Sequence, residues 1–283
     1  DLGRAASSSG SAAAMSWTCV GVGSSGRTPD SSDRRHDDSM TGRRGDESEV
    51  RCNVSIPTNV THVTVQRKAG SAIGGGRAPM AGYYRGRMRV ATWNVNSVRT
   101  RAERIAAFLE RNDVDVLAMQ ETKTADAKFP YATFEAAGYE VAHVGTSQWN
   151  GVAIASRVGL DDVRDSFEGQ PAFAKEGDPE KEARAVGAVC GGVEVWSLYV
   201  PNGREIGDPH YDYKLQFLWS LADQVKPGEL QCYMGDFNVA PRDEDVWDIA
   251  WFEGKTHVTE PERAAFQMLL EAGLTEIEHD EPY

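Results

Sequence analysis

Hydrophobic positions from residue 88 onward fall into short apolar runs that alternate with amphipathic segments, whereas residues 1–87 show almost no such pattern. Apolar, β-branched runs are typical of strands, and apolar positions at spacings of three and four are typical of helices. The predicted strands are Arg89–Val95, Val114–Met119, Tyr139–Val144, Gly151–Ser156, Ala185–Cys190, Val193–Val200 and Leu230–Met234. The predicted helices are Val98–Asn112 with Ser97 as its N-cap, a helical turn over Phe129–Ala137, Tyr211–Val225 and Glu262–Ala272.

The order of these elements predicts the fold class. Two pairs of neighbouring strands look like hairpins, namely Tyr139–Val144 with Gly151–Ser156 and Ala185–Cys190 with Val193–Val200. Hairpins interspersed with helices favour an α/β (α+β) fold in which two packed mixed sheets are flanked by helices, rather than a doubly wound parallel sheet.

The segment 1–87 is rich in Ser, Gly, Arg and Asp, and only Val60–Val65 suggests a strand. Such a composition buries too little apolar area to offset the chain entropy, so we predict disorder there. Met88 directly precedes the first patterned strand. Residues 1–87 are therefore either translated upstream sequence that is not native or a genuine disordered extension, and residues 88–283 form the folded domain.

Charge is distributed unevenly between these two parts. Residues 1–87 carry 12 Lys and Arg against 8 Asp and Glu, whereas residues 88–283 carry 18 against 35. An acidic domain argues against a protein that simply coats nucleic acid, because affinity for phosphates comes largely from Lys and Arg. A nuclease with a local basic groove beside an acidic metal site remains compatible with this charge.

The spacing of the cysteines and the hydropathy of the chain indicate the cellular compartment of the protein. Cys19, Cys52, Cys190 and Cys232 show no zinc-binding spacing, and we interpret them as free thiols in a reducing environment. No apolar run approaches the roughly 18–20 residues that span a bilayer, and no signal-peptide pattern is present. We therefore expect a cytoplasmic protein with no membrane partner.

Four polar clusters each follow a predicted strand. They are Thr92–Asn96, Gln120–Lys123, Tyr199–Gly203 and Gly235–Asn238. Strand ends at one edge of a sheet would gather an Asn, a Glu, a Tyr and an Asp/Asn pair. Hydrolysis of a phosphodiester needs a hard cation, a base for water and donors for the phosphoryl oxygens, and this set of side chains can provide all three.

Each side chain in these clusters also has an interpretation without a functional role. Glu121 is our principal metal ligand, although most glutamates at strand ends are simply solvated. Asn94 can orient that carboxylate or bind the metal, and Asn96 fits a turn-capping role better. Asp236 is the base for water or the acid for the leaving oxygen, and Asn238 binds a phosphate oxygen, although Gly-Asp and Asn are common in turns. Tyr199 hydrogen-bonds the phosphate or packs in the sheet.

The ordered motifs T-W-N-V-N-S-V-R, D-V-L-A-M-Q-E-T-K, W-N-G-V-A-I, S-L-Y-V-P-N-G and Y-M-G-D-F-N-V-A-P resemble the exonuclease–endonuclease–phosphatase superfamily. The Q-E-T-K and Y-V-P-N-G forms are similar to its DNA-repair branch of the exodeoxyribonuclease III type. The resemblance covers residues 88–283. It implies a four-layer αββα sandwich and a Mg²⁺-dependent enzyme, with Mn²⁺ as a substitute, that cuts duplex DNA 5′ to abasic sites. It also implies 3′–5′ exonuclease and 3′-phosphatase activities in a monomer.

Position by position, the resemblance places Asn94 and Glu121 at the metal and Tyr199 at the phosphate. It makes Asp236 and Asn238 the catalytic pair, and Lys123 and Arg184 are weaker candidates for DNA contacts that could equally be surface charges.

The sequence departs from this family after the helix predicted at Glu262–Ala272. The family continues with an aromatic-rich segment and closes on a Ser-Asp-His motif, and neither is found here. We therefore expect an incomplete second sheet with an open apolar edge, and a chain that is C-terminally truncated and by itself inactive. A superfamily phosphoesterase for a lipid or sugar phosphate and a non-catalytic DNA-binding remnant are the alternatives.

Overall fold

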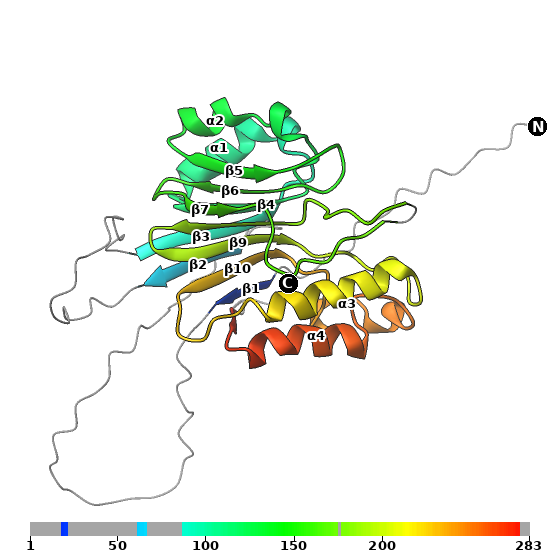
Figure 1. Ribbon diagram of the computed structural model, residues 1–283. Coiled ribbons are helices and arrows are strands. Elements are labelled where there is room, and N and C mark those ends of the chain that lie inside the picture. The colour runs from blue at the N-terminus through cyan, green and yellow to red at the C-terminus, as the bar shows by residue number, and fades with distance from the viewer. Residues whose placement is uncertain (1–17, 22–60, 67–86, 175–176, 278–283) are drawn as a thin grey trace, which may run out of the picture.

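Strands and helices form four layers in the computed structural model, which describes residues 18–21, 61–66, 87–174 and 177–277 (Figure 1). The helices α1 (Ala102–Arg111) and α2 (Tyr131–Ala136) form one outer layer, and α3 (Pro209–Ala222) and α4 (Glu260–Glu271) form the other. Two sheets lie between them. The predicted αββα sandwich is therefore confirmed.

The first sheet has five strands in the order β2-β3-β4-β6-β5. Only β3 and β4 pair in parallel, and every other neighbour is antiparallel, including the predicted hairpin of β5 and β6. Its strands are β2 (Thr61–Gln66), β3 (Arg87–Asn94), β4 (Val116–Gln120), β5 (Glu140–Val144) and β6 (Val152–Ser156).

The second sheet has six strands in the order β11-β1-β10-β9-β8-β7. Here β9 and β10 are parallel, and β8 and β9 form the other predicted hairpin. Its strands are β1 (Thr18–Gly21), β7 (Asp161–Arg164), β8 (Ala185–Cys190), β9 (Val193–Tyr199), β10 (Gln231–Asp236) and β11 (Thr275–Ile277). The edge of β10 that we expected to be open is paired, because β1 lies antiparallel to it.

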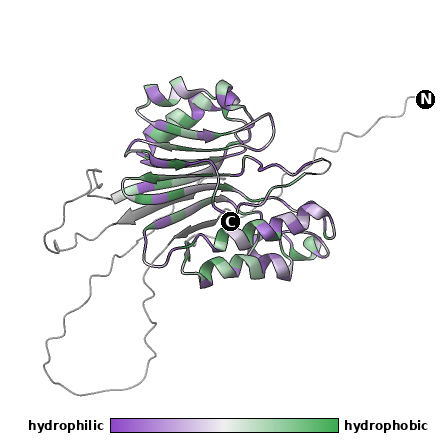
Figure 2. Cartoon of the chain, in the orientation of Figure 1, coloured by the Kyte–Doolittle hydropathy of each residue, from purple (hydrophilic) through white to green (hydrophobic). Residues whose placement is uncertain are grey.

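Three hydrophobic clusters fill the spaces between the layers. One packs α3 and α4 on the second sheet through side chains such as Phe217, Phe266 and Trp196. Another packs the two sheets face to face, and the third packs α1 and α2 on the first sheet. Figure 2 shows the corresponding pattern, in which α3 and α4 alternate hydrophobic and hydrophilic positions along their lengths. Burial on both faces explains why β4, β6 and β10 read as continuous apolar runs.

Side chains cap the N-termini of α3 and α4, but the cap predicted for the first helix is absent. Asp208 accepts a hydrogen bond from His210 N at the start of α3, and Thr259 and Glu262 form a capping box at α4. Our prediction that Ser97 caps a helix from Val98 to Asn112 was wrong. Ser97 makes no side-chain cap bond, and a 3₁₀ turn, η1 (Val98–Thr100), precedes α1.

Several short elements had no clear sequence signal. They are β1, β7, β11 and the 3₁₀ turns η2 (Asp126–Lys128), η3 (Asp243–Asp245) and η4 (Ile249–Phe252). Within residues 1–87, where we predicted disorder, the structure describes the strands β1 and β2 and the first residue of β3. Residues 1–17, 22–60 and 67–86, including Cys52, lie outside the described part of the chain, as do His279 and the rest of 278–283.

Two further predictions concern the thiols and the membrane. Cys190 and Cys232 are free and buried, and burial raises the pKa of the Cys190 thiol to about 12. Among the residues that the structure describes, no helix is both long enough and apolar enough to cross a bilayer.

Candidate active site

The four polar clusters converge at the carboxyl ends of two parallel strand pairs. Asn94 ends β3 and Glu121 directly follows β4, while Tyr199 ends β9 and Asp236 ends β10. The register pairs Asn94 with Gln120 in one sheet and Asp236 with Tyr199 in the other. Because the sheets pack face to face, the structure brings together the side chains of Asn94, Glu121, Tyr199 and Asp236, as their positions predicted.

The Asn94 amide holds the two carboxylates of this site in place. Its Nδ2 donates to Glu121 Oε1 over 2.7 Å and to Asp236 Oδ2 over 3.4 Å. Its Oδ1 accepts from the backbone N–H of Asn96 over 3.1 Å. The Asn96 side chain in turn accepts from Lys123 Nζ over 2.6 Å. The Asn94 side chain therefore bridges the carboxylates of Glu121 and Asp236, which belong to different sheets.

Glu121 is surrounded by donors. Its Oε2 lies 2.6 Å from Lys123 Nζ, and the Tyr199 hydroxyl donates to the carboxylate. Burial tends to raise the pKa of Glu121, but hydrogen bonds from Lys123, Asn94 and Tyr199 outweigh it and hold the pKa below its usual range. Glu121 is thus ionised near neutral pH.

Asp236 has the opposite electrostatic character. Its side chain is buried, and Oδ1 accepts from the backbone N–H of Asn238 over 3.1 Å. Burial and the nearby charge of Glu121 raise the pKa of Asp236 to about 7. Two close carboxylates with pKa values displaced in opposite directions are typical of a site that transfers protons.

Tyr199 is a hydrogen-bond donor beside these carboxylates. Burial and the charges of Glu121 and Asp236 raise the pKa of its phenol, so the hydroxyl keeps its proton. The guanidinium of Arg184 lies 5.0 Å from the centre of the Tyr199 ring, and Arg184 Nη1 donates to Tyr199 O. Tyr199 is therefore held by Glu121 at its hydroxyl and by Arg184 at its ring and carbonyl.

Arg184 does not occupy the exposed position that a direct DNA contact requires. Its side chain is 6% exposed, and Nε lies 2.6 Å from Glu182 Oε2. Glu182 also accepts from Asn150 Nδ2 over 3.0 Å. Lys123, the other predicted DNA contact, is 31% exposed and paired with Glu121. Sequence position alone identified both charges but not their intramolecular partners.

Sequence reasoning missed a buried ion pair behind Asn238. Lys214 and Glu262 are both fully buried, and Lys214 Nζ donates to Glu262 Oε1 and to the carbonyl of Asn238. Asn238 Nδ2 donates to Val200 O over 2.9 Å, so the turn is anchored on two sides. The helical pattern of Tyr211–Val225 contained a signal, because Lys214 stands among apolar neighbours on both sides.

Residues at the site adopt a backbone conformation that is rare for side-chain-bearing residues. Asn96, Ser97, Glu121, Lys123 and Asn238 all have positive φ, with values from 41° to 85°. Outside Gly, Asn and Asp, this conformation costs free energy that the surrounding structure must offset. Its concentration at the ends of three strands is typical of a functional site.

The site offers hard oxygen ligands for a metal ion. Glu121 and Asp236 provide carboxylate oxygens and Asn94 provides an amide oxygen, and Mg²⁺ needs only one or two carboxylates because it keeps several waters. No group of three or more His, Cys, Asp or Glu side chains that could hold a metal ion by itself occurs in the described residues, so Asn94 and water would have to complete the ligand set. The side chains therefore fit a magnesium-like cation better than zinc.

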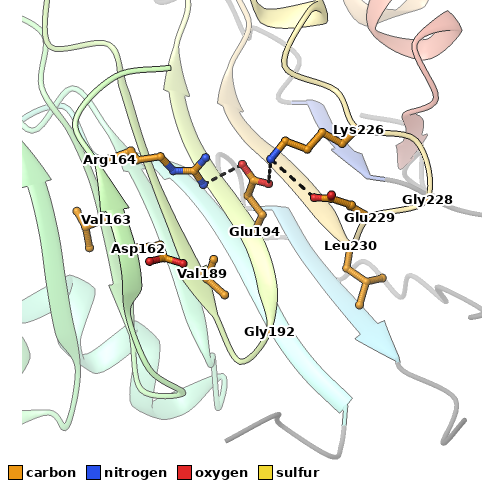
Figure 3. Close-up of a pocket in the computed structure, with 10 residues that line it drawn as sticks. All are labelled: Asp162, Val163, Arg164, Val189, Gly192, Glu194, Lys226, Gly228, Glu229 and Leu230. Carbon is orange, nitrogen blue, oxygen red and sulfur yellow. Dashed lines mark ion pairs between the residues drawn. The ribbon is translucent and has the colours of Figure 1, made fainter. Parts of the chain in front are cut away.

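A separate pocket lies at the opposite ends of β9 and β10 (Figure 3). Gly192 and Leu230 border it, and each stands directly before one of these strands. Four of its charged side chains pair with one another, since Glu194 lies 2.8 Å from Arg164 and 3.6 Å from Lys226, which lies 3.7 Å from Glu229. None of the predicted site residues lies there.

Comparison with known proteins is consistent with this geometry. Residues 91–259 match the model of the Endonuclease/Exonuclease/phosphatase family. Exodeoxyribonuclease III of Haemophilus influenzae is 28% identical over 201 residues, which are 66% of this chain and 73% of that protein.

Two solved structures are similar in sequence as well as fold. An AP endonuclease from Archaeoglobus fulgidus is 37% identical with a TM-score of 0.57, and the match covers 65% of this chain and 70% of that one. A 3′ phosphatase from Neisseria, bound to a product DNA hairpin, is 35% identical with a TM-score of 0.60 and coverages of 66% and 72%.

Proposed function

Because this chain belongs to the Endonuclease/Exonuclease/phosphatase family, we propose that it is a DNA repair nuclease that hydrolyses the backbone of duplex DNA 5′ to abasic sites. It also removes nucleotides and phosphate groups from 3′ ends. The similarity to exodeoxyribonuclease III, to an AP endonuclease and to a 3′ phosphatase supports this assignment. We also propose a monomer as the active unit, which the meeting of Asn94, Glu121, Tyr199 and Asp236 within one chain supports.

The observation that carries the proposal is the pair of carboxylates joined by Asn94. Glu121 is held ionised by its donors, and Asp236 has its pKa raised to about 7. A permanently charged carboxylate serves to bind a cation, whereas a carboxyl that titrates near neutral pH serves to exchange a proton. The two roles thus fall on different residues of one small cluster.

Glu121 and Asn94 are the residues that hold the divalent cation, Mg²⁺ or Mn²⁺, which supplies positive charge to the phosphoryl oxygens. Asp236 accepts a proton from the attacking water. The Tyr199 hydroxyl donates a hydrogen bond to a phosphoryl oxygen, and Asn238 does so through the amide hydrogen that Val200 does not use. Lys123, at the rim, contacts the DNA backbone, and Arg184 orients Tyr199 from behind.

The test is incision of a labelled duplex that contains a single abasic-site analogue. For the full-length protein we expect cleavage on the 5′ side in Mg²⁺, none in EDTA, and cleavage slowed by about 10²–10⁴-fold in the Asp236→Asn variant. A matched intact duplex and a duplex with a 3′-phosphate measure the endonuclease and phosphatase specificity. Lipid and sugar phosphates serve as competing substrates. Hydrolysis of those compounds without incision of DNA would contradict the proposal, and so would DNA binding without any cleavage.

A further inference from the structure

Exposed large hydrophobic side chains are concentrated around the candidate active site. Eight such side chains are found in the described residues, and Val163, Trp219 and Met268 lie on β7, α3 and α4. The other five lie on three connecting segments that border the site, namely Trp149, Ile206, Trp247, Ile249 and Trp251, of which Ile249 and Trp251 belong to the 3₁₀ turn η4. Apolar groups gathered on loops at one rim mark a binding surface more often than scattered ones do.

Trp247 and Trp251 form the most ordered part of this surface, and we refer to these two rings as the tryptophan platform. Their ring centres are 5.6 Å apart, and the side chains are 61% and 48% exposed. Trp251 packs 4.9 Å from the buried ring of Phe252, and Lys255 Nζ lies 3.0 Å from its ring centre. Trp251 is thus held by Phe252 and Lys255 and in turn contacts Trp247, while much of the area of both rings stays open.

The loop that carries the platform is tied to the site. It follows β10, which ends at Asp236. The backbone N–H of Ala240, two residues after Asn238, donates to the carbonyl of His257 over 2.8 Å, which closes the loop at its base. Thr256 Oγ1 donates to Arg204 O over 3.4 Å, and Arg204 lies on the loop that follows Tyr199. The platform therefore stands on the same rim as Asp236 and Tyr199.

Charge on this loop indicates which part of a nucleic acid the platform contacts. The loop that carries the rings holds five acidic residues, Asp243, Glu244, Asp245, Asp248 and Glu253, against the basic Arg242 and Lys255. Asp243 lies 2.8 Å from Arg263 and Asp245 lies 3.3 Å from Arg242, but an acidic excess remains. Acidic side chains disfavour the phosphate backbone that an intact duplex presents. An indole face, in contrast, accepts the face of any base.

We propose that the tryptophan platform stacks on a base that has lost its place in the double helix, at an abasic site, at a gap or at a frayed 3′ end. This inference rests on the proposed function and specifies the substrate class. Unstacked bases are available only at such defects, so the platform favours damaged over intact DNA. It contributes to specificity and takes no part in the chemical step.

The test is equilibrium binding in EDTA, where hydrolysis is prevented, to two duplexes of the same sequence, one intact and one with a single-nucleotide gap. Stacking on one base is worth about 1–3 kcal/mol, so Trp247→Ala and Trp251→Ala should each weaken binding to the gapped duplex about 5- to 150-fold. Binding to the intact duplex should stay within about twofold. Trp247→Phe should retain part of the preference, and Trp219→Ala, an exposed tryptophan on α3, is the matched control.

Equal weakening for both duplexes, or no weakening for either, would overturn the inference. Incision of the abasic duplex by the unmodified protein, measured in parallel, distinguishes failure of the proposed function. If the protein incises the abasic duplex but shows no platform-dependent preference, only the stacking inference is overturned. If it neither binds nor incises DNA, the proposed function is overturned as well.

Discussion

Asn94 and Asp236 join the two sheets of this protein, since Asn94 Nδ2 lies 3.4 Å from Asp236 Oδ2. The same nitrogen donates to Glu121 Oε1 at 2.7 Å. An amide placed between two carboxylates lowers their mutual repulsion and fixes their separation. Sliding of one sheet over the other would disrupt this contact, so the spacing of the site depends on the packing between the sheets.

Glu121→Gln should weaken the dependence on Mg²⁺ and reduce turnover about 10²-fold, because one charged ligand is lost. The amide keeps the shape of the side chain, so the fold should be unchanged by circular dichroism. The measurement is incision rate against Mg²⁺ concentration, with Glu110→Gln on α1 as a control outside the site. Unchanged activity at limiting Mg²⁺ would remove Glu121 from the site.

Asp236→Asn should lower turnover by about 10²–10⁴, because the proton acceptor is lost. DNA binding should be kept or strengthened, since a negative charge near the phosphate is removed. A variant that lost binding and turnover together would indicate a structural role.

The same substitution should stabilise the metal-free protein. Because burial and Glu121 raise the pKa of Asp236 to about 7, the folded protein binds a proton that the unfolded chain releases above about pH 4. This group therefore reduces stability as pH rises from about 4 to 7. Removing it should increase the free energy of unfolding at pH 8 in EDTA by on the order of 1–3 kcal/mol. A lower melting temperature for Asp236→Asn would contradict this account.

The sequence was sufficient to predict the side chains that converge on the site, and the reason is geometric. Asn94, Glu121, Tyr199 and Asp236 each end an apolar run, and the carboxyl ends of parallel strands meet at one edge. The partners of these residues could not be predicted in the same way. Arg184 precedes a strand as a surface charge would, but Glu182 and Tyr199 bury it.

Elements with little apolar content were the ones that sequence reasoning missed. The strand β7 has the sequence Asp-Asp-Val-Arg, and its side chains are mostly exposed, so no hydrophobic alternation marks it. Its place is decided by pairing with β8. Ser97 is a common N-cap residue, but the hydrogen bonds from Ser97 N to Glu121 O and from Val98 N to Thr122 O hold this segment against the loop after β4. Tertiary contacts thus overrode the local preference.

Lys214→Met should destabilise the protein by about 3–5 kcal/mol, because Glu262 would remain as a buried, unpaired charge. The two atoms Lys214 Nζ and Glu262 Oε1 are in direct contact, and both side chains are fully buried. The double variant Lys214→Met with Glu262→Gln should recover a large part of this loss, since no buried charge is left. Urea unfolding measures all three free energies.

Lys226→Met is the matched control for that experiment. Lys226 is 53% exposed and lies 3.6 Å from Glu194 and 3.7 Å from the exposed Glu229. A pair of this kind contributes about 1 kcal/mol or less. A cost below about 1 kcal/mol for Lys214→Met as well would show that the buried pair is not important for stability.

Stability should fall as pH decreases from about 6.5 to 4, and His210 should contribute to that loss. The ring is buried, Nδ1 accepts from Gly203 N over 3.3 Å, and burial together with the charges of Arg184 and Arg204 lowers the pKa of His210 to about 4. Between these two values the unfolded chain binds a proton that the folded protein does not, so acid favours unfolding, and above pH 6.5 the effect vanishes.

His210→Asn keeps an acceptor near Gly203 but cannot titrate. Relative to the unmodified protein, this variant should therefore lose less stability between pH 7 and pH 4.5, by on the order of 1–2 kcal/mol in urea unfolding. The slope should decrease rather than disappear, since burial also lowers the pKa of His143 and His257 to about 4. An identical pH dependence in the two proteins would show that His210 is not held neutral in the folded state.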